Sequence, residues 1–157
     1  TLSFQLVLQD SDYDAVTQEQ TITVNVTGNA SSYQVTGKTV LENNGVKLTE
    51  LGIVSDTDSS LYGYHIFYAV ENGTSDTISV GLEYNSLSIN GYMTDFSDID
   101  GDIPAGKTGI LCIDIYTEAA ESAGITSVDD IKEIEFLLCV RDENYNDILE
   151  ENVKSAR

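Results

Sequence analysis

The stretch that decides the fold is residues 133–151, EIEFLLCVRDENYNDILEE, because the chain opens with a second version of it. Residues 2–19, LSFQLVLQDSDYDAVTQE, align with it at a constant offset that places Phe4 on Phe136. Both stretches begin with alternating apolar residues, which is typical of a half-buried strand, and both continue into an acidic loop. This internal repeat predicts the end of one domain followed by a whole domain of the same kind.

The repeat predicts three parts along the chain. Residues 1–28 are expected to be the C-terminal strand pair of a preceding, incomplete repeat, because they match the end of the second copy. Residues 29–32, Asn-Ala-Ser-Ser, are small and polar and are expected to form a linker. Residues 33–157 are then the complete domain.

The first segment carries an apolar face that would have lost its own core. By strand alternation, this face is formed by Phe4, Leu6, Leu8 and Ile22. Two-stranded hairpins are marginal in water, so the face needs cover. It can pack on its own domain, but we favour pairing with a second copy in a strand-exchanged homodimer, with these four residues as the oligomer contact.

Short apolar runs separated by turn residues favour an antiparallel β-sandwich for residues 33–157. The longest run, residues 61–71, is apolar or aromatic on both faces and is therefore expected to be a central strand. Thr117, as an N-cap, and Gly124, as a stop, predict one short helix between them. Residues 95–106 are expected to form an acidic loop, so the fold class is all-β with one short helix.

The net charge of the chain limits the classes of partner that it can bind. Seven Lys and Arg residues against 27 Asp and Glu residues give a formal net charge of -20. Such a surface repels phosphate backbones and anionic lipids, so we expect no nucleic-acid partner. No apolar run approaches the roughly 18 residues of a membrane span, so no membrane insertion by this segment is expected either.

Several short motifs, taken together, give the chain a resemblance to a known family. They are Glu71-Asn72 with the strand that follows, Asn90-Gly91-Tyr92, Ala105-Gly106-Lys107, residues 125–131 and the run from Phe136 to Tyr145. Together they resemble an immunoglobulin-like accessory domain of unknown function that recurs in extracellular proteins of clostridial and related Gram-positive bacteria. The resemblance covers roughly residues 33–153, and again residues 1–26. It implies an immunoglobulin-like β-sandwich in a secreted or lipid-anchored protein, and it supplies no catalytic residues.

The acidic loop holds the best candidate for a metal site. Asp95, Asp98, Asp100 and Asp102 lie around Gly101, and carboxylate oxygens are the ligands that Ca²⁺ prefers. The closing Glu of the standard calcium loop is missing, so a solvated turn is the favoured interpretation and calcium the alternative. No other cofactor is expected.

Residues 101–108, GDIPAGKT, fit the phosphate-binding pattern G-x-x-x-x-G-K-[ST]. That pattern needs a helix after it, whose N-terminus faces the phosphates. A strand-like run follows instead, and acids surround the motif. We therefore expect a turn that enters a strand, and no nucleotide binding.

Aromatic residues and the single histidine share the predicted central strand. Tyr62, Tyr64 and Tyr68 lie on one face, where they would form either a platform for stacking sugars or, as we favour, part of the core. His65 lies on the other face. No serine stands in a nucleophile-elbow pattern, so a structural histidine and a chain without enzymatic activity are expected.

Cys112 and Cys139 each lie in an apolar strand-like run. Two buried free thiols are the favoured interpretation, and a disulfide between neighbouring strands is the alternative. The overall prediction is a non-catalytic extracellular or cell-surface accessory domain that acts as a spacer or protein-interaction module. The alternative function is a carbohydrate-binding module, with or without a calcium requirement.

Overall fold

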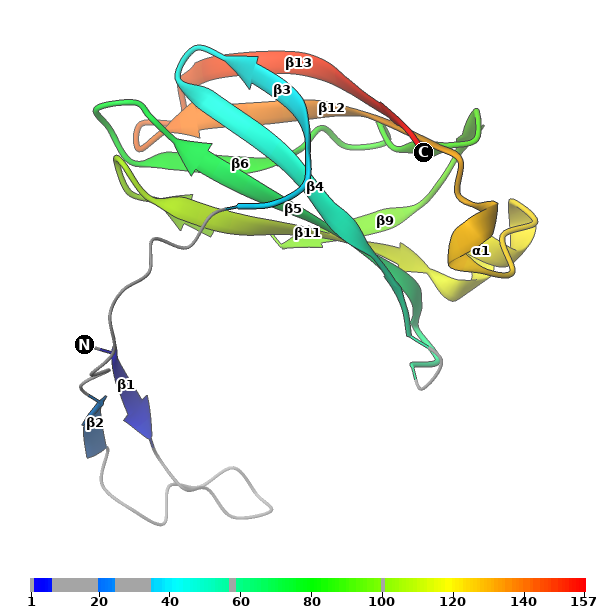
Figure 1. Cartoon of the computed structure of the whole chain (residues 1–157), viewed down its shortest axis with the longest axis horizontal. Coiled ribbons are helices and arrows are strands. Elements are labelled where there is room, and N and C mark those ends of the chain that lie inside the picture. The colour runs from blue at the N-terminus through cyan, green and yellow to red at the C-terminus, as the bar shows by residue number, and fades with distance from the viewer. Residues whose placement is uncertain (1, 7–19, 25–34, 57–58, 100) are drawn as a thin grey trace. The chain divides into compact units, whose positions relative to one another are not determined.

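The computed structural model of the chain is drawn in Figure 1. It describes residues 2–6, 20–24, 35–56, 59–99 and 101–157. The chain divides into two compact units, Thr1–Gln34 and Val35–Arg157. The division falls close to the linker expected at residues 29–32.

The described residues of the first unit, 2–6 and 20–24, form an antiparallel strand pair. Strands β1 (Leu2–Leu6) and β2 (Gln20–Val24) pair so that Phe4 lies opposite Ile22. Phe136, the residue that the sequence alignment matches with Phe4, lies opposite Val153, which is also apolar. Both strands were predicted, whereas Leu8 of the predicted apolar face lies outside the described residues.

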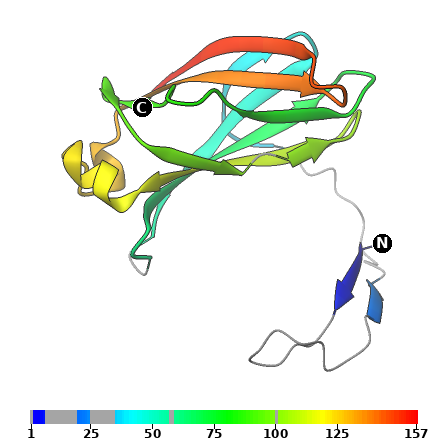
Figure 2. The same cartoon turned by 180° about the vertical axis from the view of Figure 1, so that it is seen from behind.

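The second unit is a two-sheet antiparallel β-sandwich with one short α-helix, which confirms the predicted fold class (Figures 1 and 2). The first sheet has the strand order β3 (Lys38–Asn43), β4 (Val46–Ser55), β5 (Tyr62–Asn72), β11 (Thr108–Tyr116) and β9 (Phe96–Ile99). The second sheet has the order β10 (Gly101–Ile103), β6 (Ile78–Leu82), β12 (Glu133–Asp142), β7 (Ser88–Ile89) and β8 (Tyr92–Met93). Strand β13 (Asp147–Ala156) pairs with the free side of β12.

The core lies between the two sheets and is built by strand alternation. On β5, the central strand of its sheet, Tyr64, Ile66, Tyr68 and Val70 are all buried. The ring of Tyr68 meets the ring of Phe136 on β12 edge-on, with ring centroids 5.4 Å apart. Aromatic pairs of this geometry add stability beyond the apolar area that they bury.

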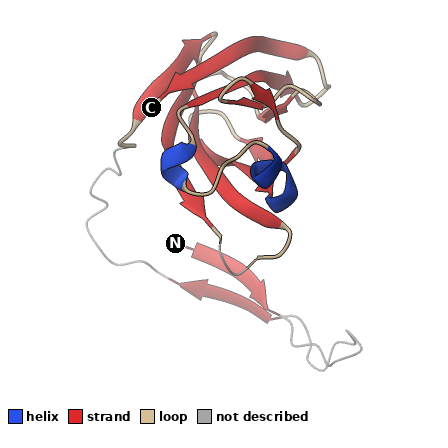
Figure 3. Cartoon of the chain, turned by 90° about the vertical axis from the view of Figure 1, so that its right-hand side faces the viewer, coloured by secondary structure: helices blue, strands red, loops and turns tan. Residues whose placement is uncertain are grey.

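The helical segments lie together at one end of the sandwich, as Figure 3 shows from that end. They are α1 (Thr117–Ser122) and the 3₁₀ helix η1 (Val128–Asp130). The helix α1 was predicted, but its N-cap is Tyr116, and Thr117 is already its first residue. Gly124 follows it with φ of 71°, the left-handed conformation that commonly ends a helix.

The predicted acidic loop at residues 95–106 is wrong, because two short strands lie within it. Strand β9 pairs with β11 in the first sheet, and β10 pairs with β6 in the second. The carboxylate of Asp98 accepts a hydrogen bond from the Leu82 N–H at 2.8 Å, which ties the two sheets together. This segment therefore carries the chain from one layer of the sandwich to the other.

Two asparagines, Asn72 and Asn90, hold turns in place. Asn90 has φ of 54°, and its side-chain oxygen accepts hydrogen bonds from the N–H groups of Lys132 and Glu133, at 2.8 and 3.1 Å. Asn72 is 2% exposed, and its amide donates to the carbonyls of Asp76 and Ile103, both at 2.8 Å. Both side chains are committed to the fold.

Candidate binding groove

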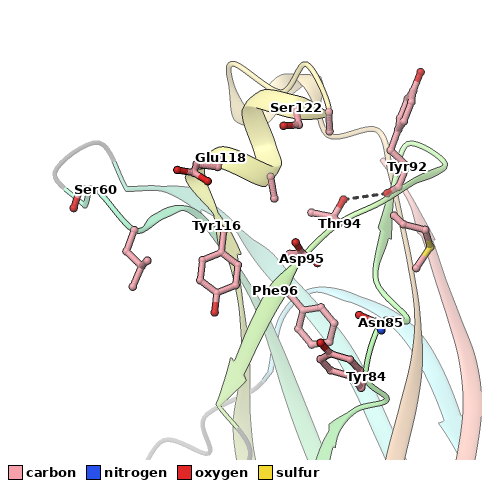
Figure 4. Close-up of a pocket in the computed structure, with 14 residues that line it drawn as sticks. Ser60, Tyr84, Asn85, Tyr92, Thr94, Asp95, Phe96, Tyr116, Glu118 and Ser122 are labelled. Atoms are coloured by element: carbon pink, nitrogen blue, oxygen red, sulfur yellow. Dashed lines mark hydrogen bonds between the residues drawn. The ribbon is translucent and has the colours of Figure 1, made fainter.

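A groove of about 950 Å³ opens at the end of the sandwich that carries α1 (Figure 4). It is lined by residues of four separate stretches of chain, 60–61, 84–85, 92–96 and 116–123, and most of these residues are aromatic, apolar or uncharged polar. These residues are Ser60, Leu61, Tyr84, Asn85, Tyr92, Met93, Thr94, Asp95, Phe96, Tyr116, Glu118, Ala119, Ser122 and Ala123. A groove of this size is sufficient for a short segment of a polymer or a small ligand.

The fold brings these segments together through local connections. Strand β11 runs directly into α1, and the Thr117 N–H donates to the Leu61 carbonyl at 3.0 Å. On the opposite wall, the Thr94 N–H donates to the Leu87 carbonyl, also at 3.0 Å. The Thr94 hydroxyl donates to the Tyr92 carbonyl at 3.0 Å, the contact drawn as a dashed line in Figure 4. Backbone hydrogen bonds therefore fix both walls.

Large side chains with little cover gather at the groove. Tyr84 is 82% exposed, Tyr92 63% and Met93 65%. Phe96 is half-buried and packs against the core. The half-buried ring of Tyr116 lies against the ring of Tyr62, with centroids 5.2 Å apart. Phe96 and Tyr116 are therefore held by packing, whereas Tyr84, Tyr92 and Met93 are exposed enough to contact a ligand.

The charges that line the groove are negative. Asp95 and Glu118 are the only ionisable acids among the lining residues, which include no Lys, Arg or His. Interaction with the neighbouring Tyr62, and then burial, raise the pKa of the Tyr116 hydroxyl. Tyr116 therefore stays neutral at physiological pH and can donate or accept a hydrogen bond. The groove suits a neutral or cationic ligand with apolar parts.

The less favoured interpretation of Tyr62, Tyr64 and Tyr68, a platform for stacking sugars, does not fit the structure. Tyr64 is 7% exposed and Tyr68 is fully buried, because both face the opposite sheet. Tyr62, at the start of β5, is half-buried against Tyr116. The favoured interpretation, that these tyrosines belong to the core, is confirmed for Tyr64 and Tyr68. The exposed tyrosines of this end are Tyr84 and Tyr92 instead.

The predicted calcium ligands are dispersed in the part of the chain that the structure describes. Asp95 lines the groove, Asp98 is bound to the Leu82 N–H, and Asp102 lies in β10 opposite Ser79. Asp100 lies outside the described residues. The three described acids do not converge into a group of metal ligands. Asp98 and Asp102 lie on strands of two different sheets, and Asp95 precedes β9.

The phosphate-binding pattern at residues 101–108 forms a turn into β11, as expected. The N–H of Gly106 donates to the Asn72 carbonyl at 2.8 Å, and that of Lys107 donates to the Pro104 carbonyl at 3.0 Å. These N–H groups are therefore used within the protein. Strand β11, rather than a helix, follows the pattern.

Both cysteines are free, so the disulfide alternative is wrong. Cys112 alternates with the core residues of β11, and Cys139 with those of β12, so the two thiols lie on the outer faces of different sheets. Burial raises the pKa of Cys112 to about 12 and that of Cys139 to about 11. Neither thiol is an activated nucleophile in this state.

Comparison with protein-family models finds no match to this chain, and comparison with curated proteins finds none either. In the part of the chain that the structure describes, no helix is long and apolar enough to cross a membrane. The groove geometry is therefore the basis for a functional argument.

The sequence reasoning missed the groove. Its lining residues come from stretches that look like ordinary turns, such as Tyr84-Asn85 and residues 92–96. One signal was present, because large aromatic residues next to turn glycines and asparagines are exposed unless another segment covers them. The missing information was which turns share one end of the sandwich.

Proposed function

We propose that the chain is a non-catalytic accessory domain of an extracellular or cell-surface protein, and that its groove binds a polypeptide segment with apolar and basic side chains. The observation that carries this proposal is the gathering of Tyr84, Tyr92 and Met93, all more than 60% exposed, in one groove with two carboxylates. Tyr, Phe and Met are enriched at protein interfaces, and exposed apolar surface of this kind marks interaction sites.

Electrostatics supports a cationic partner. The net charge of -20 creates a negative potential around the whole chain, and the groove adds Asp95 and Glu118 at the contact itself. Complementary charge speeds association and excludes acidic competitors. The family resemblance of the turn motifs supports the accessory role and the extracellular location.

A carbohydrate is the second candidate ligand. The exposed rings of Tyr84 and Tyr92 can stack on sugar rings, and Asn85, Thr94 and Ser122 provide hydrogen-bonding groups along the same groove. The glycan test is run with and without a chelator, so that it also shows whether carbohydrate binding requires calcium.

The test compares ligand classes on the full chain. A display library of random peptides and a glycan array are each probed with the wild type, with Tyr84→Ala and with Tyr145→Ala. Tyr145 is the matched control, because it is also 82% exposed but lies in the turn between β12 and β13.

We expect enrichment of peptides that combine Lys or Arg with apolar residues, and at least tenfold weaker binding by Tyr84→Ala but not by Tyr145→Ala. Specific glycan signals with the same variant pattern, and no peptide enrichment, would favour the carbohydrate. Binding that both variants retain would place the ligand outside the groove.

A further inference from the structure

Three side chains with metal-binding atoms converge on the outer face of the five-stranded sheet, and none of them lines the groove. They are His65 on β5 and Cys112 and Asp114 on β11. The strand register places them together, because Asp114 lies directly opposite His65 and Cys112 is two residues from Asp114 on the same face. Their ligand atoms all lie within 4.8 Å of one another.

One carboxylate oxygen stands at the centre of the cluster. Oδ1 of Asp114 lies 2.7 Å from Nδ1 of His65, and it accepts a hydrogen bond from the Cys112 thiol at 3.1 Å. Asp114 and Cys112 are each 8% exposed. A carboxylate buried to this degree needs compensating protons or a cation.

A second carboxylate sets the orientation of the imidazole. Oδ2 of Asp56 lies 3.4 Å from Nε2 of His65, on the side of the ring away from the cluster. Histidine ligands of metals commonly donate their other N–H to a carboxylate, which fixes the ring and its tautomer. In the metal-free protein Nδ1 donates to Asp114, and in the other tautomer, with the proton on Nε2 beside Asp56, Nδ1 offers a lone pair to a bound cation.

Two aromatic rings lie near the imidazole, whose side chain is 22% exposed. The ring centroids of Tyr62 and Phe67 each lie 6.3 Å from that of His65. Val54 lies opposite His65 on β4. The cover of the cluster comes chiefly from the burial of Cys112 and Asp114, and limited access of water strengthens the binding of a cation to a small set of ligands.

We propose that His65, Cys112 and Asp114 bind one divalent transition-metal ion, with Zn²⁺ as the best match, through Nδ1, Sγ and a carboxylate oxygen. Imidazole, thiolate and carboxylate are the donor types of zinc sites, and Ca²⁺ and Mg²⁺ prefer oxygen alone. Three protein ligands leave the fourth tetrahedral position for water. Asp56 is a positioning residue, because it acts through the imidazole.

Binding balances through one proton. The thiol of Cys112 loses its proton to solvent and coordinates as thiolate. The neutral imidazole changes tautomer, so that the proton that Nδ1 shares with Asp114 in the metal-free protein is replaced by one on Nε2 beside Asp56, and Nδ1 is free to coordinate. The cation then replaces the hydrogen bonds that Asp114 makes in the metal-free protein. The competing explanation of the cluster is that its hydrogen bonds serve only to stabilise the fold. In that case the protein would bind divalent ions with no measurable affinity at this place.

The experiment titrates the full-length chain with Co²⁺ as a spectroscopic substitute for Zn²⁺, under reducing conditions. We expect a thiolate-to-cobalt charge-transfer band in the near ultraviolet, visible bands of tetrahedral cobalt, and loss of both when Zn²⁺ is added. Cys112→Ser should lose the charge-transfer band. Cys139→Ser, the matched control with the other buried thiol, should keep it.

Two further measurements keep the test decisive if Cys112→Ser does not fold. Asp56→Asn should fold and bind Zn²⁺ 10- to 100-fold more weakly than the wild type, the usual effect of losing an outer-shell partner. In the wild type, Zn²⁺ should slow the alkylation of Cys112 but not of Cys139, as read by peptide mass spectrometry. No cobalt band in the wild type, or equal alkylation rates with and without Zn²⁺, would overturn the proposal.

Discussion

At the scale of single residues, Asn72 shows how a turn residue stabilises this fold through its hydrogen bonds. Asn72 joins two turns, because its side-chain amide donates to Asp76 and Ile103 while its side-chain oxygen accepts from the Thr74 N–H at 2.9 Å. Its own backbone N–H donates to the Lys107 carbonyl. Replacing a buried side chain with this many hydrogen bonds is expected to lower the stability of the fold, whatever the function of the domain.

Asn72→Ala should lower the free energy of unfolding by about 2–3 kcal/mol, because it leaves buried carbonyl and N–H groups without partners. Chemical denaturation measures this change directly. Asn43→Ala is the control, since Asn43 is exposed and donates to Glu151 at the surface. It should cost less than about 1 kcal/mol. Equal losses in the two variants would contradict the role assigned to Asn72.

Asp130 predicts a pH dependence of stability. A hydrogen bond from the Thr126 N–H, followed by those of the Thr126 and Ser127 hydroxyls, lowers the pKa of its carboxyl below 3.8. A group with a lowered folded pKa stabilises the fold above its unfolded pKa, and this contribution is lost as the pH falls through the folded value.

Asp130→Asn should therefore destabilise the protein at neutral pH, and the difference from the wild type should shrink as the pH falls below 3.8. Thermal melts over a series of pH values give the difference. A gap between the two melting temperatures that stays constant down to strongly acidic pH would exclude this linkage.

At the scale of elements, Gly109 controls how the two sheets meet at one edge. A Cβ atom there would lie 2.7 Å from Cδ1 and Cγ1 of Ile103, a buried residue of β10. Gly109→Ala should lower stability by about 1–3 kcal/mol through overpacking. Gly101→Ala is the control, because nothing lies within 4 Å of its Cβ position, and it should change stability by less than about 0.5 kcal/mol. Urea denaturation of both variants makes the comparison.

The strands and the helix were predictable because their signals are local. Alternation over residues 62–72 and 108–116, and the Asn44-Gly45 and Asn90-Gly91 turns, can be recognised from adjacent residues alone. The strands β9 and β10 were missed because their few apolar residues are interrupted by aspartates. One of those aspartates, Asp98, is satisfied by a backbone N–H sixteen residues away in sequence.

The candidate sites depend on information that is not local. The sequence placed His65 on one face of a strand, but its contact with Asp114 requires that β5 and β11 pair in one particular register. A shift of that register by one residue would place the two side chains on opposite faces. The tyrosine platform failed for a related reason, since a strand face rich in tyrosine can equally face the opposite sheet.

At the scale of the whole molecule, the first unit leads to a prediction of oligomeric state. Its described residues form a strand pair, and an isolated two-stranded hairpin is marginal in water. If its apolar residues Phe4, Leu6 and Ile22 pair with a second copy, deletion should turn a dimer into a monomer. Light scattering on residues 1–157 and 30–157 tests this, and two monomers would show that the strand-exchange prediction is wrong.

The groove is the central claim of this account, and nuclear magnetic resonance mapping tests it most directly. A peptide ligand selected on the full chain is titrated into isotope-labelled protein, and the amide shifts are followed residue by residue. The account predicts that the largest changes occur at Tyr84, Tyr92, Met93 and Glu118. Changes centred on the turn around Tyr145, or on the outer face of either sheet, with the groove unaffected, would contradict it.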